Sequence, residues 1–321
     1  MDKSNVSQAT GRRVVLCVPT LNAGRHWPEW LSRTLEALSQ VGGSLRVIDS
    51  SSEDDTAALA RAQRVETQVI DRAGFDHGGT RNLALETLFE EACHDDDIVI
   101  FMTQDALVDG PHTLKALVSG FDHPEVGAIY GRQLPHSDAT PIAAHARLFN
   151  YPPHSHRVLP SRMGEYGIKA AFLSNSFTAY RVTALKAVGG FPERTILGED
   201  MIAGARLLGA GWQLAYCAEA RVFHSHNLSL SREFRRYFDI GVMHAHQAWL
   251  LDMMGRAESE GRRFVRSELG YLARHRKRAI PEALLRTQLK YLGYRLGGIE
   301  QRLPRWLKRR LSMQPGYWCT L

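Results

Sequence analysis

The stretch Asp97-Ile98-Val99-Ile100-Phe101-Met102-Thr103-Gln104-Asp105-Ala106 contains the strongest strand signal in the chain. Its apolar run is rich in β-branched side chains and lies between polar residues, which is typical of a buried central strand. Shorter apolar runs occur on both sides of it, separated by segments with apolar residues at helical spacing. Strands that alternate with helices indicate parallel β-α units, so the sequence predicts an α/β fold.

Working outward from this strand, the sequence predicts further elements on both sides. The expected strands are Val14–Pro19, Leu45–Ile48, Gln68–Ile70, Asp97–Thr103 and Val126–Tyr130. The expected helices are Trp27–Leu38, Glu53–Ala62 with Ser52 as its N-cap, Thr80–Cys93 and Asp109–Phe121. The segment Gln133–Gly167 is rich in Pro, His and Arg and lacks periodicity, so it is expected to be a long loop near the site.

Polar residues follow these strands at regular places. Thr20 and Asn22 follow the first strand, Asp49 follows the second, and Gln104 and Asp105 follow the central strand. Ligands of parallel sheets bind outside the carboxyl ends of the strands. We therefore expect these side chains to converge on one edge of the sheet.

The last third of the chain differs from the rest in composition. From residue 231 to the end it contains 19 Lys and Arg against 8 Asp and Glu, and helical patterns are interrupted by Pro281 and Pro304. The sequence therefore predicts two domains, residues 1–230 and a basic helical region at residues 231–321. Such a region can bind an anionic surface, a membrane or a nucleic acid, or can be a set of solvated helices. The chain has no helix-turn-helix, zinc-finger or RNP signature, so nucleic acid is not expected as a partner.

Composition limits the class and the compartment. The chain has 321 residues, 44% of them hydrophobic and 23% charged, which excludes disorder and collagen-like structure for the whole chain. The sequence shows no secretory signal and no stretch of the roughly 20 apolar residues that a membrane span needs. Its four cysteines form no C-x-x-C pair, which indicates a reducing compartment. We expect a cytoplasmic protein.

Acidic residues at two places have alternative interpretations. Asp105, at the end of the central strand, is placed either to hold a divalent metal or to cap a turn. Glu199 and Asp200 follow Gly198 and precede a helical stretch, where the helix dipole favours acids. Alternatively, an acid at this position is a general base that removes a proton from a hydroxyl group.

Histidine and glycine motifs add two further candidates. His224 follows an apolar run and can ligate a metal, but H-x-H also occurs at His154/His156 and His244/His246. The Gly-rich segment 74–82 is either a turn or a pyrophosphate site in which Arg81 opens a helix. No Gly-Lys-Ser/Thr and no G-x-G-x-x-G motif is present, which argues against a P-loop enzyme and a nicotinamide dehydrogenase.

Taken together, these motifs resemble those of family 2 inverting glycosyltransferases of the GT-A fold. Within that family the chain looks most like bacterial rhamnosyltransferases that use dTDP-L-rhamnose. The resemblance runs from Val14 to Leu230, and residues 312–318 are similar to endings in that group. The residues that carry it are Pro19-Thr20-Leu21-Asn22, Asp49-Ser50-Ser51-Ser52, Phe75-Asp76-His77-Gly78-Gly79-Thr80-Arg81-Asn82, Gln104-Asp105-Ala106, Gly198-Glu199-Asp200 and Val222-Phe223-His224-Ser225-His226.

The resemblance implies a fold and a set of site residues. The fold would be GT-A, a Rossmann-like, mostly parallel sheet flanked by helices, here with a basic helical C-terminal extension. Asp200 would be the catalytic base, and Asp105 and His224 would hold Mg²⁺ or Mn²⁺, with His226 the weaker candidate. In this chain Thr103 stands where the family's D-x-D metal motif has its first Asp, so Asp105 is the motif's remaining carboxylate. The nucleotide sugar would be bound by Pro19, Thr20, Asn22, Asp49, Arg81, Gln104 and Asp105.

The implied reaction moves L-rhamnose from dTDP-L-rhamnose onto a hydroxyl of a cell-surface polysaccharide or lipopolysaccharide intermediate. The alternatives are the same enzyme class with a UDP-hexose or UDP-N-acetylhexosamine donor, and a nucleotide-sugar sensor without catalysis. The acceptor would be a glycan or glycolipid, reached from the inner face of the cell membrane through the basic C-terminal helices. The basic residues expected to face lipid head groups are Arg262, Arg263, Arg266, Arg274, Arg276, Lys277, Arg278, Arg305, Lys308, Arg309 and Arg310.

Overall fold

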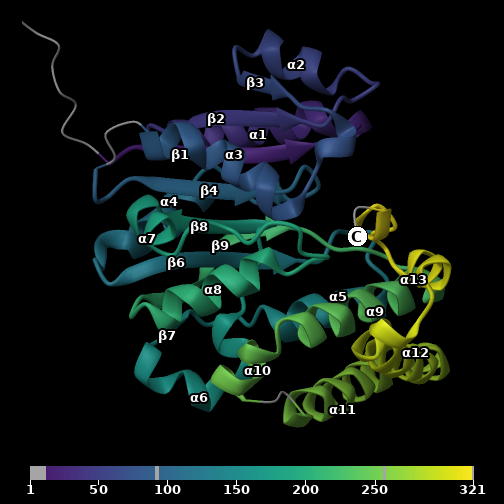
Figure 1. Ribbon diagram of the computed structural model, residues 1–321. Coiled ribbons are helices and arrows are strands. Elements are labelled where there is room, and N and C mark those ends of the chain that lie inside the picture. The colour runs from purple at the N-terminus through teal and green to yellow at the C-terminus, as the bar shows by residue number, and fades with distance from the viewer. Residues whose placement is uncertain (1–11, 91–93, 256–257, 320–321) are drawn as a thin grey trace, which may run out of the picture.

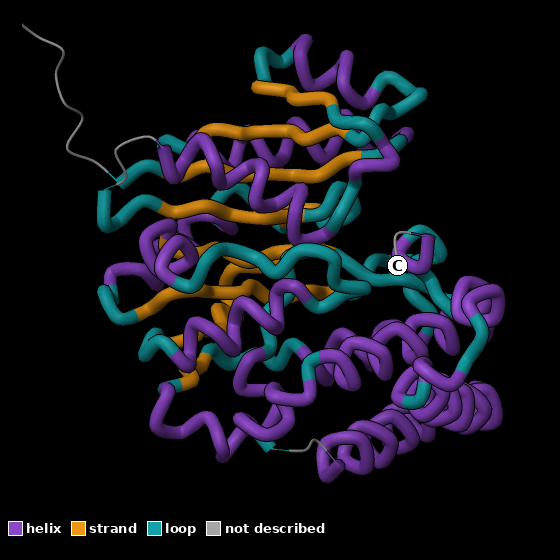
Figure 2. Tube along the Cα trace, viewed as in Figure 1, coloured by secondary structure: helices purple, strands orange, loops and turns teal. Residues whose placement is uncertain are grey.

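The computed structural model describes residues 12–90, 94–255 and 258–319. A nine-stranded sheet has helices on both faces, and further helices extend from one end of it (Figures 1 and 2). The strand order is β3-β2-β1-β4-β8-β6-β9-β5, and β7 also pairs with β9. The strands are β1 Val14–Thr20, β2 Ser44–Asp49, β3 Glu66–Val69, β4 Ile98–Met102, β5 Leu107–Val108, β6 Val126–Leu134, β7 His156–Val158, β8 Phe177–Arg181 and β9 Gln213–Phe223.

The direction of the strands decides where the functional residues lie. Strands β1 to β4 are parallel, as the alternating pattern predicted. Strand β8 is antiparallel to both β4 and β6, and β9 is parallel to β6. The carboxyl ends of β1, β2, β4, β6 and β9 therefore share one edge with the beginning of β8. Segments from across the chain meet at this edge.

Two apolar cores lie on the two faces of the sheet. Strand side chains alternate between faces, so Leu16 and Val18 enter one core while Val15 and Cys17 enter the other. The first core is covered by α1 (Trp27–Ser39), α2 (Thr56–Ala62) and α4 (Thr113–Ser119). The second is covered mainly by α3 (His77–Glu90), α7 (Val182–Ala187) and α8 (Glu199–Gly209).

Several predicted helix ends differ from the observed ones. Helix α2 begins at Thr56 instead of Glu53, because the Ser52 hydroxyl bonds Asp49 and does not cap the helix. Helix α3 begins at His77, so Arg81 lies in its second turn instead of opening it. The predicted end of this helix at Cys93 lies outside the described residues.

The segment Gln133–Gly167 is not the long loop that its composition suggested. It contains the end of β6, helix α5 (Pro141–Asn150), strand β7 and helix α6 (Met163–Tyr166). Thr140 caps α5 by accepting a hydrogen bond from the Ala143 amide, and Pro141 occupies the first turn. This cap and the proline are local helix signals that the His/Pro/Arg composition obscured.

The C-terminal third is helical, as predicted. Its helices are α9 Leu230–His246, α10 Ala248–Met254, α11 Glu258–His275, α12 Ile280–Gly298 and α13 Arg305–Leu311. Helices α9 and α12 lie in close contact, because Gly293 and Gly297 of α12 face the α9 backbone. A Cβ atom on Gly297 would lie 2.0 Å from the Phe238 carbonyl oxygen. Within the described residues, we find no helix with the length and apolar character that crossing a bilayer requires.

Candidate active site

A pocket of about 360 Å³ opens at the shared strand edge. Pro19, Thr20 and Leu21 contribute to it from the end of β1, and Thr103 and Gln104 from the end of β4. The remaining lining residues are Ser50, Arg72, Phe75, His77 and Arg81. Four of the residues predicted to bind a nucleotide sugar line this pocket: Pro19, Thr20, Arg81 and Gln104. Asp105 directly follows Gln104 in the chain.

Asp49 lies beneath the pocket wall and is almost fully buried. Its carboxylate accepts hydrogen bonds from the Thr20 hydroxyl at 2.7 Å, from the Ser52 amide at 2.8 Å and from the Ser52 hydroxyl at 2.6 Å. These contacts join the loop after β2 to the end of β1. Asp49 therefore holds the pocket wall in shape, and Ser50 next to it lines the pocket.

Gln104 and Asn22 connect neighbouring loops. The Gln104 side chain accepts from the Leu21 amide at 2.8 Å and donates to the Leu21 carbonyl at 3.0 Å. Asn22, with a positive φ of 47°, accepts from the Glu53 amide through its side chain. Both side chains are therefore occupied in fixing the rim, and their role toward a ligand stays a prediction.

Arg81 joins the Gly-rich segment to the second acidic motif. Its guanidinium donates to the His77 carbonyl at 2.7 Å and lies 3.2 Å from a Glu199 carboxylate oxygen. Both side chains are buried, and the Arg81 Nε has no partner among the described residues. Burial raises the pKa of Glu199, but the neighbouring Arg81 and His77 lower it by more. The pKa is therefore below its ordinary value, and Glu199 stays ionised.

Asp200 follows Glu199 at the first turn of α8 and has a different environment. Its carboxylate accepts from the Asn175 amide at 3.0 Å and from the Met201 amide at 2.8 Å. Burial and the negative charge of Glu199 raise the pKa of Asp200 to about 7. A carboxylate with this pKa is a suitable general base near neutral pH.

Asp105, His224 and His226 form a cluster beside the pocket. One ligand atom from each lies within 4.8 Å of the others. The Asp105 oxygens lie 3.5 Å from His224 Nε2 and 3.6 Å from His226 Nε2. The structure therefore brings both His224 and His226 close to Asp105, although the motif had made His226 the weaker candidate.

The orientation of His224 decides what this cluster can bind. Its Nδ1 lies 2.8 Å from Gln133 Oε1, an acceptor, so the ring proton belongs on Nδ1. Burial lowers the pKa of His224, which favours the neutral ring. With this tautomer the Nε2 lone pair faces the Asp105 carboxylate at 3.5 Å, and a cation between these two acceptors would satisfy both. The oxygen and nitrogen donors fit a divalent metal.

Comparisons with known proteins identify the family and the fold. Residues 12–239 match the family described as "Glycosyltransferase like family 2". An O-antigen chain rhamnosyltransferase from Salmonella anatum is 46% identical over 94% of this chain and 95% of the relative. A second one, from Salmonella typhimurium, is 45% identical over 95% of this chain and 96% of the relative.

The chain belongs to glycosyltransferase family 2. Solved structures agree on the fold of this glycosyltransferase. A mannosyltransferase from Pyrobaculum calidifontis, solved with GDP-Man and Mn²⁺, superposes with a TM-score of 0.60 over 92% of this chain and 89% of the other, at 19% identity. Residues 1–349 of Staphylococcus aureus TarS give a TM-score of 0.51 at 15% identity over 90% and 91% of the two chains. The predicted GT-A fold is thus confirmed.

Three side chains of this glycosyltransferase were missed by sequence reasoning. Gln133, at the end of β6, accepts from Arg147 Nη1 at 2.5 Å through the same oxygen that contacts His224. The charge of Arg147 lowers the pKa of both cluster histidines, and that of Arg236 on α9 lowers the pKa of His226. Neither arginine forms an ion pair with a described carboxylate. A cap signal at Thr140 could have placed Arg147 on a helix, but nothing local indicated its partners.

The C-terminal tail also reaches this glycosyltransferase's pocket. Gln314 Nε2 lies 3.2 Å from Nε2 of His77, a pocket residue. Asp239 of α9 accepts from the Met313 amide at 2.8 Å, and the buried Trp318 packs near Phe238. The tail motif is therefore held by α9 and supports the pocket wall from outside the sheet.

Proposed function

We propose that this glycosyltransferase moves L-rhamnose from dTDP-L-rhamnose onto a hydroxyl of an O-antigen intermediate, with inversion at the anomeric carbon. The observation that carries the proposal is the 46% identity to an O-antigen chain rhamnosyltransferase over nearly the whole of both chains. Family membership alone gives only the reaction class, since one fold accepts many sugars.

In this proposal the nucleotide occupies the pocket at the ends of β1 and β4. Thr20, Leu21 and Ser50 surround the nucleoside, and Asp49 holds that wall in shape. Arg81, with its unpartnered Nε, faces the nucleotide from α3. The diphosphate then extends past Gln104 toward Asp105.

In the proposed chemical step, one proton moves to Asp200 and one bond at the anomeric carbon is exchanged for another. Asp200 accepts the proton of the acceptor hydroxyl, and the oxygen attacks the anomeric carbon from the face opposite the diphosphate. The bond from that carbon to the diphosphate oxygen breaks, and dTDP leaves. A β-linked donor therefore gives an α-rhamnoside.

The leaving diphosphate needs positive charge. A divalent cation, Mg²⁺ or Mn²⁺, held by Asp105 and His224 with His226, would supply it. Nitrogen ligands favour Mn²⁺, because Mg²⁺ prefers oxygen. Arg147 and Arg236, which are not paired with described carboxylates, add fixed positive charge beside the same cluster. These arginines would stabilise the negative charge of the diphosphate directly, which lessens its dependence on a metal held by a single carboxylate.

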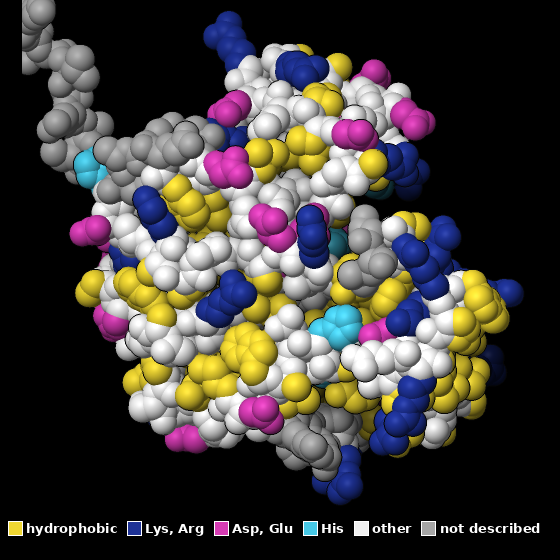
Figure 3. Space-filling view, viewed as in Figure 1, with side chains coloured by type: hydrophobic (Ala, Val, Ile, Leu, Met, Phe, Trp, Pro, Cys, Tyr) yellow, Lys and Arg dark blue, Asp and Glu magenta, His cyan; other side chains and the backbone are white. Residues whose placement is uncertain are grey.

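The acceptor side of the proposal concerns the membrane. We place the reaction at its cytoplasmic face, with the basic C-terminal helices directed toward anionic lipid. Lys and Arg side chains gather on the side of the molecule where these helices lie (Figure 3). Arg305 and Lys308 are occupied internally, by the Trp318 carbonyl and by Glu300. The exposed run Arg276–Arg278 between α11 and α12 is the stronger candidate.

A donor screen tests the proposal. Purified protein is incubated with dTDP-rhamnose, UDP-glucose, UDP-galactose, UDP-N-acetylglucosamine or GDP-mannose, each with Mg²⁺, Mn²⁺ or EDTA. Release of nucleotide from dTDP-rhamnose, lost in EDTA, is expected. Release from a UDP-sugar alone would replace the rhamnosyl assignment with the UDP-hexose or UDP-N-acetylhexosamine alternative. If every donor is silent, calorimetry with dTDP separates an acceptor-dependent enzyme from a protein that does not bind the donor.

A further inference from the structure

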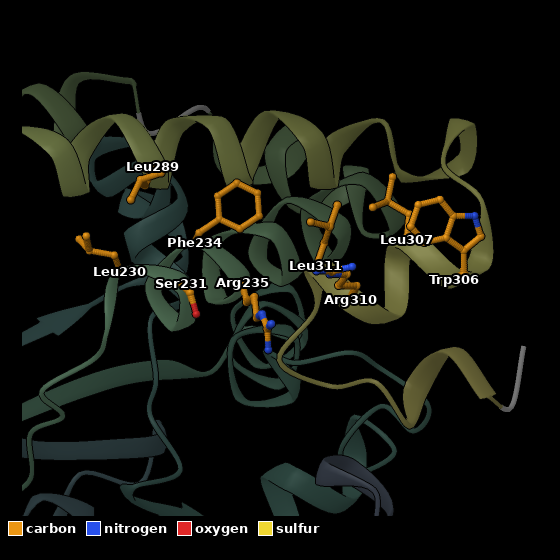
Figure 4. Close-up of a pocket in the computed structure, with 9 residues that line it drawn as sticks. All are labelled: Leu230, Ser231, Phe234, Arg235, Leu289, Trp306, Leu307, Arg310 and Leu311. Carbon is orange, nitrogen blue, oxygen red and sulfur yellow. The ribbon is translucent and has the colours of Figure 1, made fainter.

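A second and larger cavity lies away from the strand edge, between α9, α12 and α13 (Figure 4). Its volume is about 600 Å³, within the range of small-molecule sites. Six of its nine lining residues are apolar: Leu230, Phe234, Leu289, Trp306, Leu307 and Leu311. Trp306 is 66% exposed, which is high for so large an apolar side chain. We call this cavity the helical groove.

The polar lining of the helical groove has one sign of charge. Arg235 and Arg310 are its charged residues, and Ser231 is the remaining polar one. Neither arginine forms an ion pair within the part of the chain that the structure describes. An apolar trough with unpaired guanidinium groups suits an amphiphile that has a hydrocarbon chain and an anionic head.

Helix α9 and the tail connect the helical groove to the pocket at the strand edge. Arg235 of α9 and Leu311 of α13 line the groove, and Gln314, three residues after Leu311, lies 3.2 Å from the pocket residue His77. One turn further along α9, Asp239 holds the tail that contacts the pocket residue His77. The groove is thus joined to the pocket at the strand edge through α9 and the tail.

We infer that the helical groove binds the lipid part of a glycolipid acceptor. The hydrocarbon chain lies along Phe234, Leu289 and Leu307, and Arg235 and Arg310 bind the phosphate or diphosphate between lipid and sugar. The sugar then extends past Arg236 toward Asp200. The transfer of a sugar to this acceptor rests on the proposed function. Binding of the lipid in the groove does not depend on which donor the enzyme uses.

Bilayer phospholipid is the competing occupant. The position of the groove favours the acceptor, because the chain runs from the groove residue Leu311 to Gln314, which contacts the pocket residue His77, and a phospholipid anchor has no need of such a connection. The membrane contact proposed for Arg276–Arg278 lies at the N-terminal end of α12, whereas α13, which lines the groove, follows its C-terminal end. The two surfaces can therefore be tested by separate substitutions.

The first experiment measures binding of radiolabelled farnesyl diphosphate to the full chain by equilibrium dialysis, with dTDP present at saturation. Leu307→Glu, Phe234→Ser and Arg310→Gln are compared with Leu292→Glu and Arg302→Gln. Leu292 and Arg302 are exposed residues of the same region that do not line the groove. We expect the dissociation constant to rise at least tenfold in the three groove variants and to stay within twofold in the two controls. Circular dichroism confirms that each variant is folded.

The second experiment measures transfer to two acceptors that carry the same sugar, one on a long isoprenyl diphosphate and one on a propyl group. Groove variants should raise KM for the lipid acceptor at least tenfold and leave KM for the propyl glycoside unchanged. Equal farnesyl diphosphate binding by wild type and all variants would overturn the inference. So would groove-dependent binding of phospholipid vesicles without binding of farnesyl diphosphate. If farnesyl diphosphate binds in the groove but no sugar is transferred, the proposed function fails and the lipid site stands.

Discussion

Asp200 and Glu199 are adjacent acids whose surroundings separate their pKa values. Glu199 is buried against Arg81 and stays ionised, whereas burial and the charge of Glu199 raise the pKa of Asp200 to about 7. Pairs of acids with separated pKa values are typical of sites that move protons. The proposed division of labour is that Glu199 fixes Arg81 and Asp200 accepts the acceptor proton.

Replacing Asp200 with Asn tests this role. The amide keeps the shape of the side chain but cannot accept the proton, so transfer should fall by about 100- to 10,000-fold. Binding of dTDP, measured by calorimetry, should change little because the pocket lining does not include Asp200. Transfer at near wild-type rates by the Asn variant would exclude Asp200 as the base.

The dependence of the rate on pH follows from the same carboxylate. Only ionised Asp200 accepts a proton, so kcat at saturating donor should fall about tenfold per pH unit below pH 7 and level off above it. Glu199→Gln removes a negative charge that raises the pKa of Asp200, so the acid limb should move to lower pH. An acid limb that stays in place in the Gln variant would contradict the assignment.

At the scale of elements, the packing of α9 on α12 positions both Arg236 and the tail. The two backbones approach closely at Gly293 and Gly297, where Cβ atoms would lie 2.5 Å and 2.0 Å from carbonyl oxygens of α9. Glycine weakens a helix by roughly 1 kcal/mol relative to alanine, so its presence here reflects packing and not helix propensity.

Alanine substitutions at two neighbouring glycines test this contact. Gly297→Ala forces α12 away from α9 and should destabilise the fold by about 1–3 kcal/mol. Gly298→Ala is the matched control, since a Cβ there meets nothing within 4 Å and alanine favours the helix. Urea unfolding measures both. Equal stability of the two variants would show that the α9–α12 contact is not tight.

For the whole molecule, the uneven charge distribution predicts salt-sensitive binding to anionic bilayers. Arg276, Lys277 and Arg278 form an exposed run at the α11–α12 turn, and each basic residue near an anionic surface contributes about 1 kcal/mol. Substituting all three with Ala should therefore weaken co-sedimentation with vesicles that contain anionic lipid, at low salt. Transfer to a water-soluble acceptor should be unchanged. Equal binding of wild type to neutral and anionic vesicles would argue against the membrane contact.

Much of the fold could be read from local patterns. The four parallel strands, the residues at their ends and the basic helical region follow from periodicity and composition, which depend on neighbours in sequence. The same patterns failed for residues 133–167, where Thr140 and Pro141 start a helix inside a segment rich in loop-forming residues.

The sequence by itself determined the class of fold and the family, and it made Asp105, Asp200 and His224 candidates because each follows or precedes an element with a clear local signal. Only the tertiary structure decided that His226 approaches Asp105, that Gln133 orients His224, that Arg81 pairs with Glu199 and that the tail contacts His77. These contacts join residues separated by as many as 237 positions. They arise from strand order and helix packing, which local sequence patterns do not specify.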